Sequence, residues 1–292
     1  MATLRLIKRR MKSVVNISKI TRGMQMVAAS KMRKAQQEAM AGKVYAQKIL
    51  KAVGELCAKT DPKLHPLLRQ GDKRGKILVI LISTNKGLCG GLNTNLFKAV
   101  HHWFFQKEEN SSSSIVFITM GRKGREFVIK TGRQLIADFS RNYPFIQDVP
   151  ALTSLIVDGF LKGEYRQVFL VFNEFISVFK QRPLKKPLLP LTTLEFLLTA
   201  EEKLPIWGDF LIEPSPVAVL NSLLPHYLEI EMRSAILEAE AGEHSARMMA
   251  MKNATDNAVS LSAELSLEYN KARQETITNE IADITRAREV MK

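Results

Sequence analysis

The chain has 292 residues, 46% of them hydrophobic and 25% charged, which is an ordinary composition for one or two folded domains with a sizeable core. Its formal net charge is +14, and its two cysteines, Cys57 and Cys89, stand far apart without metal-ligand or redox-pair spacing. This excludes a disulfide framework and fits a reducing compartment. No run of about 18 apolar residues and no secretory signal pattern occur, so we expect no membrane-spanning helix.

Residues 1–59 predict one long, basic helix. They contain 14 Lys or Arg, two acids and no proline, and their apolar residues recur at intervals of three and four. One seam in a single phase consists mainly of small side chains: Ala28, Met32, Ala35, Ala39, Gly42, Ala46, Ile49, Val53 and Leu56. Earlier blocks keep this spacing in a shifted phase, as in coiled coils with stutters. At about 1.5 Å per residue the helix is roughly 85 Å long, too long to bury its apolar stripe without a partner.

The middle of the chain predicts an open α/β domain of Rossmann-like type. Prolines and glycines indicate a linker at residues 60–75, and the domain is expected over residues 76–213. Three buried strands and three helical runs alternate along it, as is typical of α/β sheets. The strands are expected at 76–83, 114–120 and 166–175, and the helical runs at 92–106, 123–130 and about 151–161.

The chain ends in a second long helix, expected over residues 214–292. Three prolines mark its start, and we expect Pro225 to kink this helix or to separate a short leading turn from it. Residues 226–292 contain 12 acids against eight Lys or Arg, whereas residues 1–59 have a formal charge of +12. Because the two terminal helices are complementary in charge and in length, we expect them to form a long antiparallel coiled coil.

Small residues in both seams set the expected register of this coiled coil. Gly42 and Gly242 occupy equivalent positions among alanines, so we expect the helix axes to approach most closely there, with paired positions that sum to about 280. This register places Met24 near residues 250–260. It also leaves roughly the last twenty residues as a single helix, at about 1.5 Å per residue. The apolar side chains of that segment have no partner within the chain: Ile277, Ile281 and Ile284.

The central domain contains one segment that could hold a phosphate. STNKGLCGGLN, residues 83–93, lies between a strand and a helix, where backbone amides can bind anions. It has neither the GxxxxGK[ST] nor the GxGxxG pattern, so we predict a tight turn that needs positive φ. The five histidines are scattered and expected at the surface, and adjacent His101 and His102 point about 100° apart on a helix. We expect no catalytic, metal-binding or cofactor-binding residue.

The basic first helix could face phosphates, anionic lipid or an acidic protein surface, and charge alone does not choose among them. A coiled-coil nucleic-acid-binding protein would explain this helix, although its basic cluster lacks the interleaved aromatic residues of a stacking surface. A nucleotide-using α/β enzyme would explain the central sheet. Both alternatives stay open on the residues alone.

Four longer sequence motifs identify a family more specifically than charge and composition do. KITRGMQMVAASKMRKAQ (19–36) and the segment 247–281, which begins RMMAMKNATDN, closely resemble the two terminal signatures of the gamma subunit of F-type ATP synthases. ISTNKGLCGGLNTNL (82–96) is similar to that family's first strand and turn, and WGDFLIEPSP (207–216) to the start of its last helix. The resemblance covers the whole chain. It implies a central rotor shaft that couples proton-driven rotation of a c ring to ATP synthesis or hydrolysis, without a cofactor or catalytic residue of its own.

The resemblance also implies partners and residue roles. The partners are three alpha and three beta subunits, an epsilon subunit and the c ring, on the cytoplasmic face of the bacterial inner (plasma) membrane. Four residues would contact the beta subunits: Met24, Arg247, Gln274 and Thr278. Two would belong to a foot near the c ring and epsilon: Phe210, where the family often has tyrosine, and Glu213. The inserted cysteine pair of plastid members does not occur here, and the tail ITRAREVMK departs from the small apolar tail of bacterial members.

Overall fold

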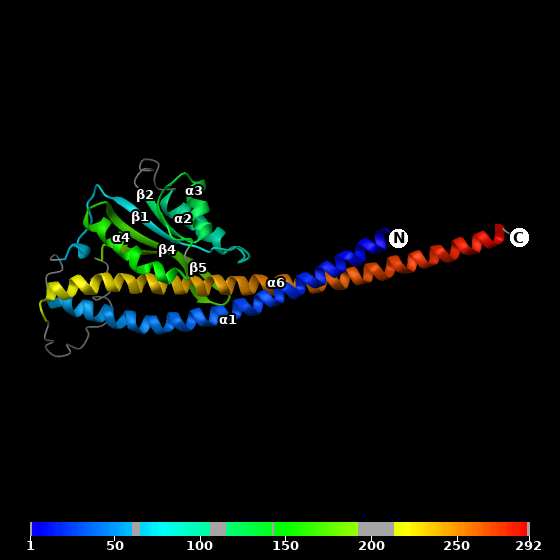
Figure 1. Ribbon diagram of the computed structural model, residues 1–292, viewed down its shortest axis with the longest axis horizontal. Coiled ribbons are helices and arrows are strands. Elements are labelled where there is room, and N and C mark those ends of the chain that lie inside the picture. The colour runs from blue at the N-terminus through cyan, green and yellow to red at the C-terminus, as the bar shows by residue number, and fades with distance from the viewer. Residues whose placement is uncertain (1, 60–64, 106–114, 142, 192–212, 291–292) are drawn as a thin grey trace. The chain divides into compact units, whose positions relative to one another are not determined.

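The computed structural model describes residues 2–59, 65–105, 115–141, 143–191 and 213–290. The chain forms two compact units. The sheet unit consists of residues 31–246, and the terminal unit consists of residues 1–30 together with 247–292. Figure 1 shows both units, with most of their helices and strands labelled.

Two long helices begin and end the chain. α1 spans Ala2–Lys59 and α6 spans Pro216–Val290, so both predicted long helices are confirmed. α6 continues through Pro225, and the expectation that this proline separates off a leading turn is wrong. Ser215 caps the start of α6, because its Oγ accepts a hydrogen bond from the backbone N–H of Ala218 at 3.2 Å. Within the described ranges, no helix combines the length and apolarity needed to cross a membrane.

The sheet unit is built on five strands in the order β3-β2-β1-β4-β5. Four strands are parallel: β1 (Lys76–Ile82), β2 (Ile115–Met120), β3 (Gln134–Asp138) and β4 (Tyr165–Ser177). β5 (Lys180–Leu189) returns antiparallel to β4. β1, β2 and β4 correspond to the three predicted strands, which confirms the α/β class of this unit.

The two strands outside the prediction lie at the edges of the sheet. β5 contains Pro183 and Pro187, which lack backbone N–H groups and are therefore tolerated only on an edge strand. β3 has no fully buried residue, so it lacks the apolar pattern that marks β1 and β2. Weak hydrophobic patterning is a consequence of edge position in both cases.

Helices cover both faces of this sheet. α2 (Leu92–Phe104) and α3 (Arg122–Lys130) pack on one face, where Leu96 and Val128 join a cluster with strand residues such as Phe117. On the other face, α4 (Val149–Leu161) shares a larger cluster with the sheet-unit parts of α1 and α6. Short 3-10 turns precede β1 (Pro66–Leu68) and α4 (Phe145–Asp148).

In the sheet unit, α6 is fixed to the hairpin of β4 and β5 by polar side chains. The Oγ of Ser245 donates a hydrogen bond to the carbonyl oxygen of Val178 at 2.6 Å, and Lys186 forms an ion pair with Glu231. Burial, with Glu231 beside it, raises the pKa of the Tyr227 phenol. α6 therefore packs directly against this hairpin.

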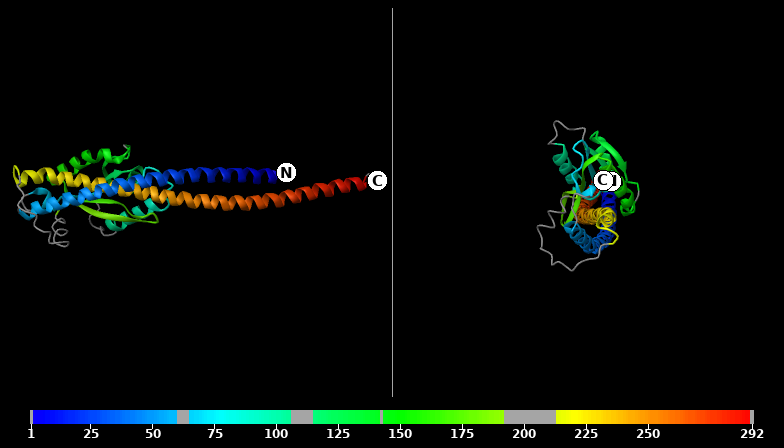
Figure 2. Two further views of the ribbon diagram at one scale, coloured as in Figure 1. Left: turned by 90° about the horizontal axis from the view of Figure 1, so that it is seen from below. Right: turned by 90° about the vertical axis from the view of Figure 1, so that its left-hand side faces the viewer.

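Also in the sheet unit, α1 and α6 run antiparallel and side by side, as Figures 1 and 2 show. The hydroxyl of Tyr45 and the Nε2 atom of His226 are 3.0 Å apart. Earlier on α1, the carboxylate of Glu38 is close enough to act on Glu240, which comes later on α6. The predicted antiparallel pairing of the terminal helices is confirmed in this unit.

The terminal unit consists of the first half of α1 and the last part of α6. Thr21 and Thr255 are both buried, and their hydroxyl oxygens lie 2.7 Å apart. These positions sum to 276, close to the predicted register, and they place Met24 opposite the start of the 250–260 segment. Ile281 is 60% exposed, so it does not pack on α1, as the same register requires.

The prediction that Gly42 and Gly242 mark the closest approach of the helices is wrong. A Cβ atom at Gly42 would meet no atom within 4 Å. At Gly242 it would lie 3.5 Å from the carbonyl oxygen of Asn173 and from the side chain of Gln181. Gly242 therefore faces the β4–β5 hairpin, because α6 has the sheet as a second partner at this level.

Candidate interaction surfaces

The terminal unit exposes both basic and apolar side chains. All seven Lys and Arg residues of positions 1–30 are exposed, and no acid occurs among them. Large apolar side chains are also exposed on both helices: Leu6, Val15, Ile17, Ile20, Met26, Val27, Val259, Leu261, Leu267, Ile277, Ile281 and Ile284. Exposed apolar groups at this density indicate a surface that another protein covers.

Met24 and Arg247 lie close to the same level of the helix pair. Met24 is half-buried on α1, one turn after Thr21, and the contact between Thr21 and Thr255 sets it opposite about residue 252. Arg247 is half-buried on α6, about 8 Å away along the axis at about 1.5 Å per residue. These two predicted contact residues thus lie within about 8 Å of each other along the axis of the helix pair.

Gln274 and Thr278 form a second group. Both are exposed on the last part of α6, on adjacent turns, and the hydroxyl of Thr278 donates to the carbonyl oxygen of Gln274 at 2.9 Å. At about 1.5 Å per residue, Gln274 is roughly 40 Å from Arg247 along the helix. The four predicted residues therefore form two separate groups rather than one site.

Of the two predicted foot residues, the structure describes Glu213. Glu213 is exposed, three residues before α6 begins. Phe210 lies outside the described residues.

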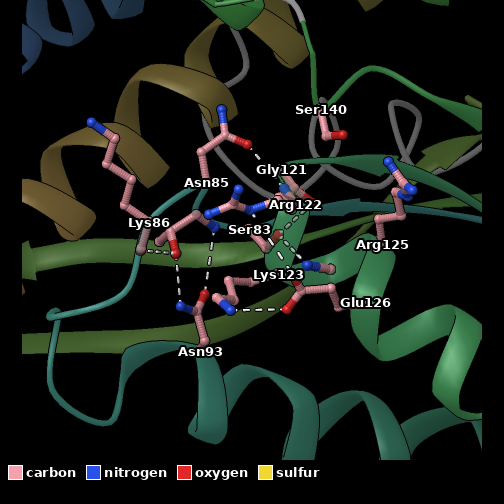
Figure 3. A network of polar contacts seen from close by, with 12 residues as sticks. Ser83, Asn85, Lys86, Asn93, Gly121, Arg122, Lys123, Arg125, Glu126 and Ser140 are labelled. Carbon is pink, nitrogen blue, oxygen red and sulfur yellow. Dashed lines mark hydrogen bonds and ion pairs between the residues drawn. The ribbon is translucent and has the colours of Figure 1, made fainter.

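The carboxyl edge of β1 and β2 is filled by a polar network (Figure 3). Three consecutive amides at the start of α3 donate to the segment that follows β1. The N–H of Arg122 donates to Asn85 Oδ1 at 2.9 Å, that of Lys123 to the Thr84 carbonyl oxygen at 3.1 Å, and that of Gly124 to Ser83 Oγ at 2.7 Å. Amides used in this way are not available to hold a phosphate.

The turn after β1 is locked by its own residues. Asn93 donates from its side-chain nitrogen to the Thr84 hydroxyl at 2.7 Å, and that hydroxyl donates to the carbonyl oxygen of Lys86 at 2.8 Å. Leu88 and Gly90 have φ of 62° and 58°, so the predicted positive-φ turn is confirmed. A non-glycine residue adopts this conformation rarely, and Leu88 is also 64% exposed.

Gly121 allows β1 and β2 to end in contact. Its φ is 108°, and a Cβ atom there would lie 2.1 Å from the carbonyl oxygen of Ser83. Apolar periodicity does not predict this contact, although the pair Gly121 and Gly124 directly after a buried strand is a usable signal for it.

Three cations near this edge are paired with neighbouring acids. Lys123 and Arg122 both approach Glu126, at 2.8 and 3.8 Å, and Arg125 lies 3.5 Å from Asp138. The hydrogen bond from Lys123 holds the pKa of the Glu126 carboxyl below its usual value. The Arg122, Lys123 and Arg125 side chains drawn in Figure 3 therefore do not form an open anion site.

Two histidines depart from the expected surface position. His65 is buried, and its Nδ1 accepts a hydrogen bond from the backbone N–H of Leu67 at 3.2 Å. Burial lowers the pKa of this imidazole. His244 is also buried, whereas His101, His102 and His226 are exposed. Across the described parts of the chain, no group of His, Cys, Asp or Glu is arranged to hold a metal ion.

Comparison with known proteins decides what these surfaces belong to. The chain matches the model of the ATP synthase family over residues 3–290. It is 43% identical to an ATP synthase gamma chain of Dehalococcoides mccartyi over 288 residues, which are 97% of both chains. The chain belongs to the ATP synthase gamma chain family. An Akkermansia muciniphila gamma chain is 40% identical and is covered completely.

The fold of solved gamma-type rotors agrees. A rotor structure of the Euglena gracilis mitochondrial ATP synthase matches with a TM-score of 0.60 at 22% identity, covering 94% of this chain and 99% of that one. A second Euglena structure, of the assembly with the c ring, gives a TM-score of 0.64 and covers 99% of this chain. Gamma chains are non-catalytic subunits of the membrane-associated ATP synthase complex, and the packed edge in Figure 3 is consistent with that role.

Proposed function

We propose that this chain is the central rotor shaft of a proton-translocating ATP synthase. In this role it couples rotation of a c ring to ATP synthesis or hydrolysis at the catalytic sites of the alpha and beta subunits. The match to gamma chains over 97% of both sequences carries this proposal. A shaft transmits free energy without chemistry of its own, because it makes different contacts with each catalytic site at each angle.

The terminal unit is the part proposed to turn inside the ring of alpha and beta subunits. Its exposed cations favour an acidic lever on beta, and Met24 and Arg247 lie at one level where such a lever can contact both helices. Gln274 and Thr278 are proposed to form polar contacts nearer the tip. The exposed isoleucines at 277, 281 and 284 fit an apolar collar at the end of the shaft.

The segment before α6 is proposed to form the foot. Phe210 and Glu213 would contact the c ring and epsilon, which sets the chain on the cytoplasmic face of a bacterial inner membrane as a peripheral subunit. In domain terms, residues 1–59 and 214–292 would form the shaft, residues 76–213 its globular body, and residues 60–75 the linker.

Affinity purification of the tagged chain from its own cells tests the assembly. We expect alpha, beta, epsilon and c subunits to be recovered together. A photo-reactive amino acid at Gln274 or Thr278 should crosslink to an alpha or beta subunit, whereas the same group at exposed Lys98 on α2 serves as a control away from the terminal unit. Recovery of nucleic acid without these subunits would instead support the nucleic-acid-binding alternative.

Equilibrium binding of labelled ATP tests the enzyme alternative. We expect no binding at low micromolar concentration to the purified chain, because the amides at the start of α3 already donate to Ser83, Thr84 and Asn85. Tight binding or turnover of ATP by the chain alone would contradict the rotor assignment.

A further inference from the structure

A recess at the amino-terminal edge of the sheet has the chemistry of an anion site. Its volume of about 430 Å³ falls within the range of about 300–1,000 Å³ of small-molecule sites. The lining comes from the segment before β1, from the start of β4 and from the residue after β5: Gln70, Gly71, Lys73, Arg166, Gln167 and Pro190. The recess lies at the edge of the sheet opposite to the network in Figure 3.

Two glycines hold one wall of this recess against β4. A Cβ atom at Gly71 would lie 2.6 Å from the carbonyl oxygen of Arg166, and one at Gly75 would lie 2.7 Å from the backbone nitrogen of Arg166. Such distances leave no room for a side chain, so the segment lies directly on the β4 backbone. A hydrogen bond from Gly75 N–H to the Asp72 carbonyl oxygen, at 2.9 Å, closes the turn between them. The wall is thus a fixed part of the fold.

The two cations of the recess have no acidic partner among the residues that the structure describes. In the stretches of chain that the structure describes, neither Lys73 nor Arg166 forms an ion pair or a side-chain hydrogen bond. The Nε–H group of Arg166 is buried without an acceptor, which is costly for a charged donor. The acid next to Lys73, Asp72, accepts from the backbone N–H of Arg74 at 3.0 Å, and Glu164 lies two residues before Arg166 without an ion pair to it in the described ranges.

Neighbouring acceptors are already satisfied. The carbonyl oxygens of Asp158 and Gly159, at the end of α4, accept from the backbone N–H groups of Lys162 and Glu164 at 3.0 and 2.9 Å. The side chains that line the recess supply N–H donors from a guanidinium, an ammonium and two amides, together with the amide oxygens of Gln70 and Gln167, which accept.

We propose that this recess binds a phosphate group, supplied either by free phosphate or by the headgroup of an anionic phospholipid. A guanidinium such as that of Arg166 presents parallel N–H donors that match two phosphate oxygens. The ammonium of Lys73 adds a compact positive charge, and the two glutamine amides donate to the remaining oxygens. This proposed site does not depend on the rotor role, and each proposal is tested separately.

The purified full-length chain tests the proposal with two kinds of probe. Calorimetric titration with inorganic phosphate and pyrophosphate measures the free anion, and co-sedimentation with phosphatidylglycerol vesicles, against phosphatidylcholine vesicles, measures the headgroup. The test variant is Lys73→Gln/Arg166→Gln. The matched control is Lys98→Gln/Arg141→Gln, which removes the same charge from exposed positions outside the recess. Amide hydrogen exchange of wild-type residues 69–73, with and without each probe, needs no variant and covers the case in which the test variant does not fold.

Losing charge-assisted hydrogen bonds should weaken binding about tenfold or more in the test variant, and less than about twofold in the control. This pattern with phosphate or pyrophosphate supports a free-anion site, and the same pattern with phosphatidylglycerol vesicles alone supports a headgroup site. In either case the probe should slow exchange at residues 69–73. Equal weakening in both variants, absence of binding to every probe, or unchanged exchange at residues 69–73 overturns the proposal.

Discussion

Glu240 should make the free energy of unfolding of this chain fall as pH rises. Its Oε1 atom is buried without a hydrogen-bond partner, on the part of α6 that faces α1 in the sheet unit. Burial, together with the nearby carboxylates of Glu243 and Glu38, raises the pKa of this carboxyl to about 7, and Lys31 opposes the rise only in part. Deprotonation of Glu240 therefore destabilises the packing of the two helices in the folded chain.

The sign and size of the effect follow from linkage. Below about pH 4.5 the carboxyl is protonated in both the folded and the unfolded chain, so it has no effect on stability. Between about 4.5 and about 7 the folded chain keeps a proton that the unfolded chain has released, and stability falls with rising pH. That interval corresponds to about 3.4 kcal/mol at about 1.36 kcal/mol per pH unit. Because part of the side chain faces solvent, screening reduces the expected loss to about 2 kcal/mol.

Urea unfolding of Glu240→Gln at several pH values measures this loss. Glutamine keeps the shape and removes the charge, so we expect the variant to match wild type near about pH 4 and to exceed it by about 2 kcal/mol near about pH 8. Glu268→Gln, an exposed position on the same helix, corrects for the general effect of removing one negative charge. A difference between Glu240→Gln and wild type that is constant with pH, or largest in acid, would refute the reasoning.

Three further experiments test other parts of the structure. Gly121→Ala should destabilise the chain by about 3 kcal/mol or more, because φ is 108° and the new Cβ would lie 2.1 Å from Ser83, whereas Gly87→Ala, with open space around it, should change stability by less than about 1 kcal/mol. Similar losses in urea unfolding would contradict this account. A double-mutant cycle of Thr21→Val and Thr255→Val should give a coupling energy of about 1 kcal/mol, and additivity would mean that the hydroxyl pair does not hold the register. Met24→Lys should lower proton pumping per ATP hydrolysed in membranes while hydrolysis continues; an unchanged ratio would remove Met24 from the proposed beta contact.

The sequence predicted the elements whose burial leaves a strong pattern. Two long helices, three central strands and the helices between them follow directly from apolar periodicity and from the lack of proline. These elements share one cause, which is that each depends on a continuous apolar face. The register of the terminal helices is close to the predicted one, as the contact between Thr21 and Thr255 shows, although the glycine contact from which it was predicted is wrong.

Features that depend on two partners at once were not predictable in this way. Gly242 looked like a helix-to-helix contact, but it faces Asn173 and Gln181 because α6 packs on the sheet as well as on α1. The contact of Gly121 with Ser83 and the recess beside Arg166 are built from segments about 38 and 95 residues apart, and periodicity within one segment carries no signal of them. The proposed beta contacts rest on resemblance, because exposed Gln274 and Thr278 have no intramolecular signature.

The prolines of β5 protect the unassembled chain against aggregation through this edge strand. An edge strand with free N–H groups can recruit a strand from another molecule and so start aggregation. At Pro183 and Pro187 the outer margin of β5 has no hydrogen to offer, and the charged residues between and around them disfavour a second backbone further. A newly synthesised chain that has not yet bound its partners is therefore protected from pairing with a second copy through β5.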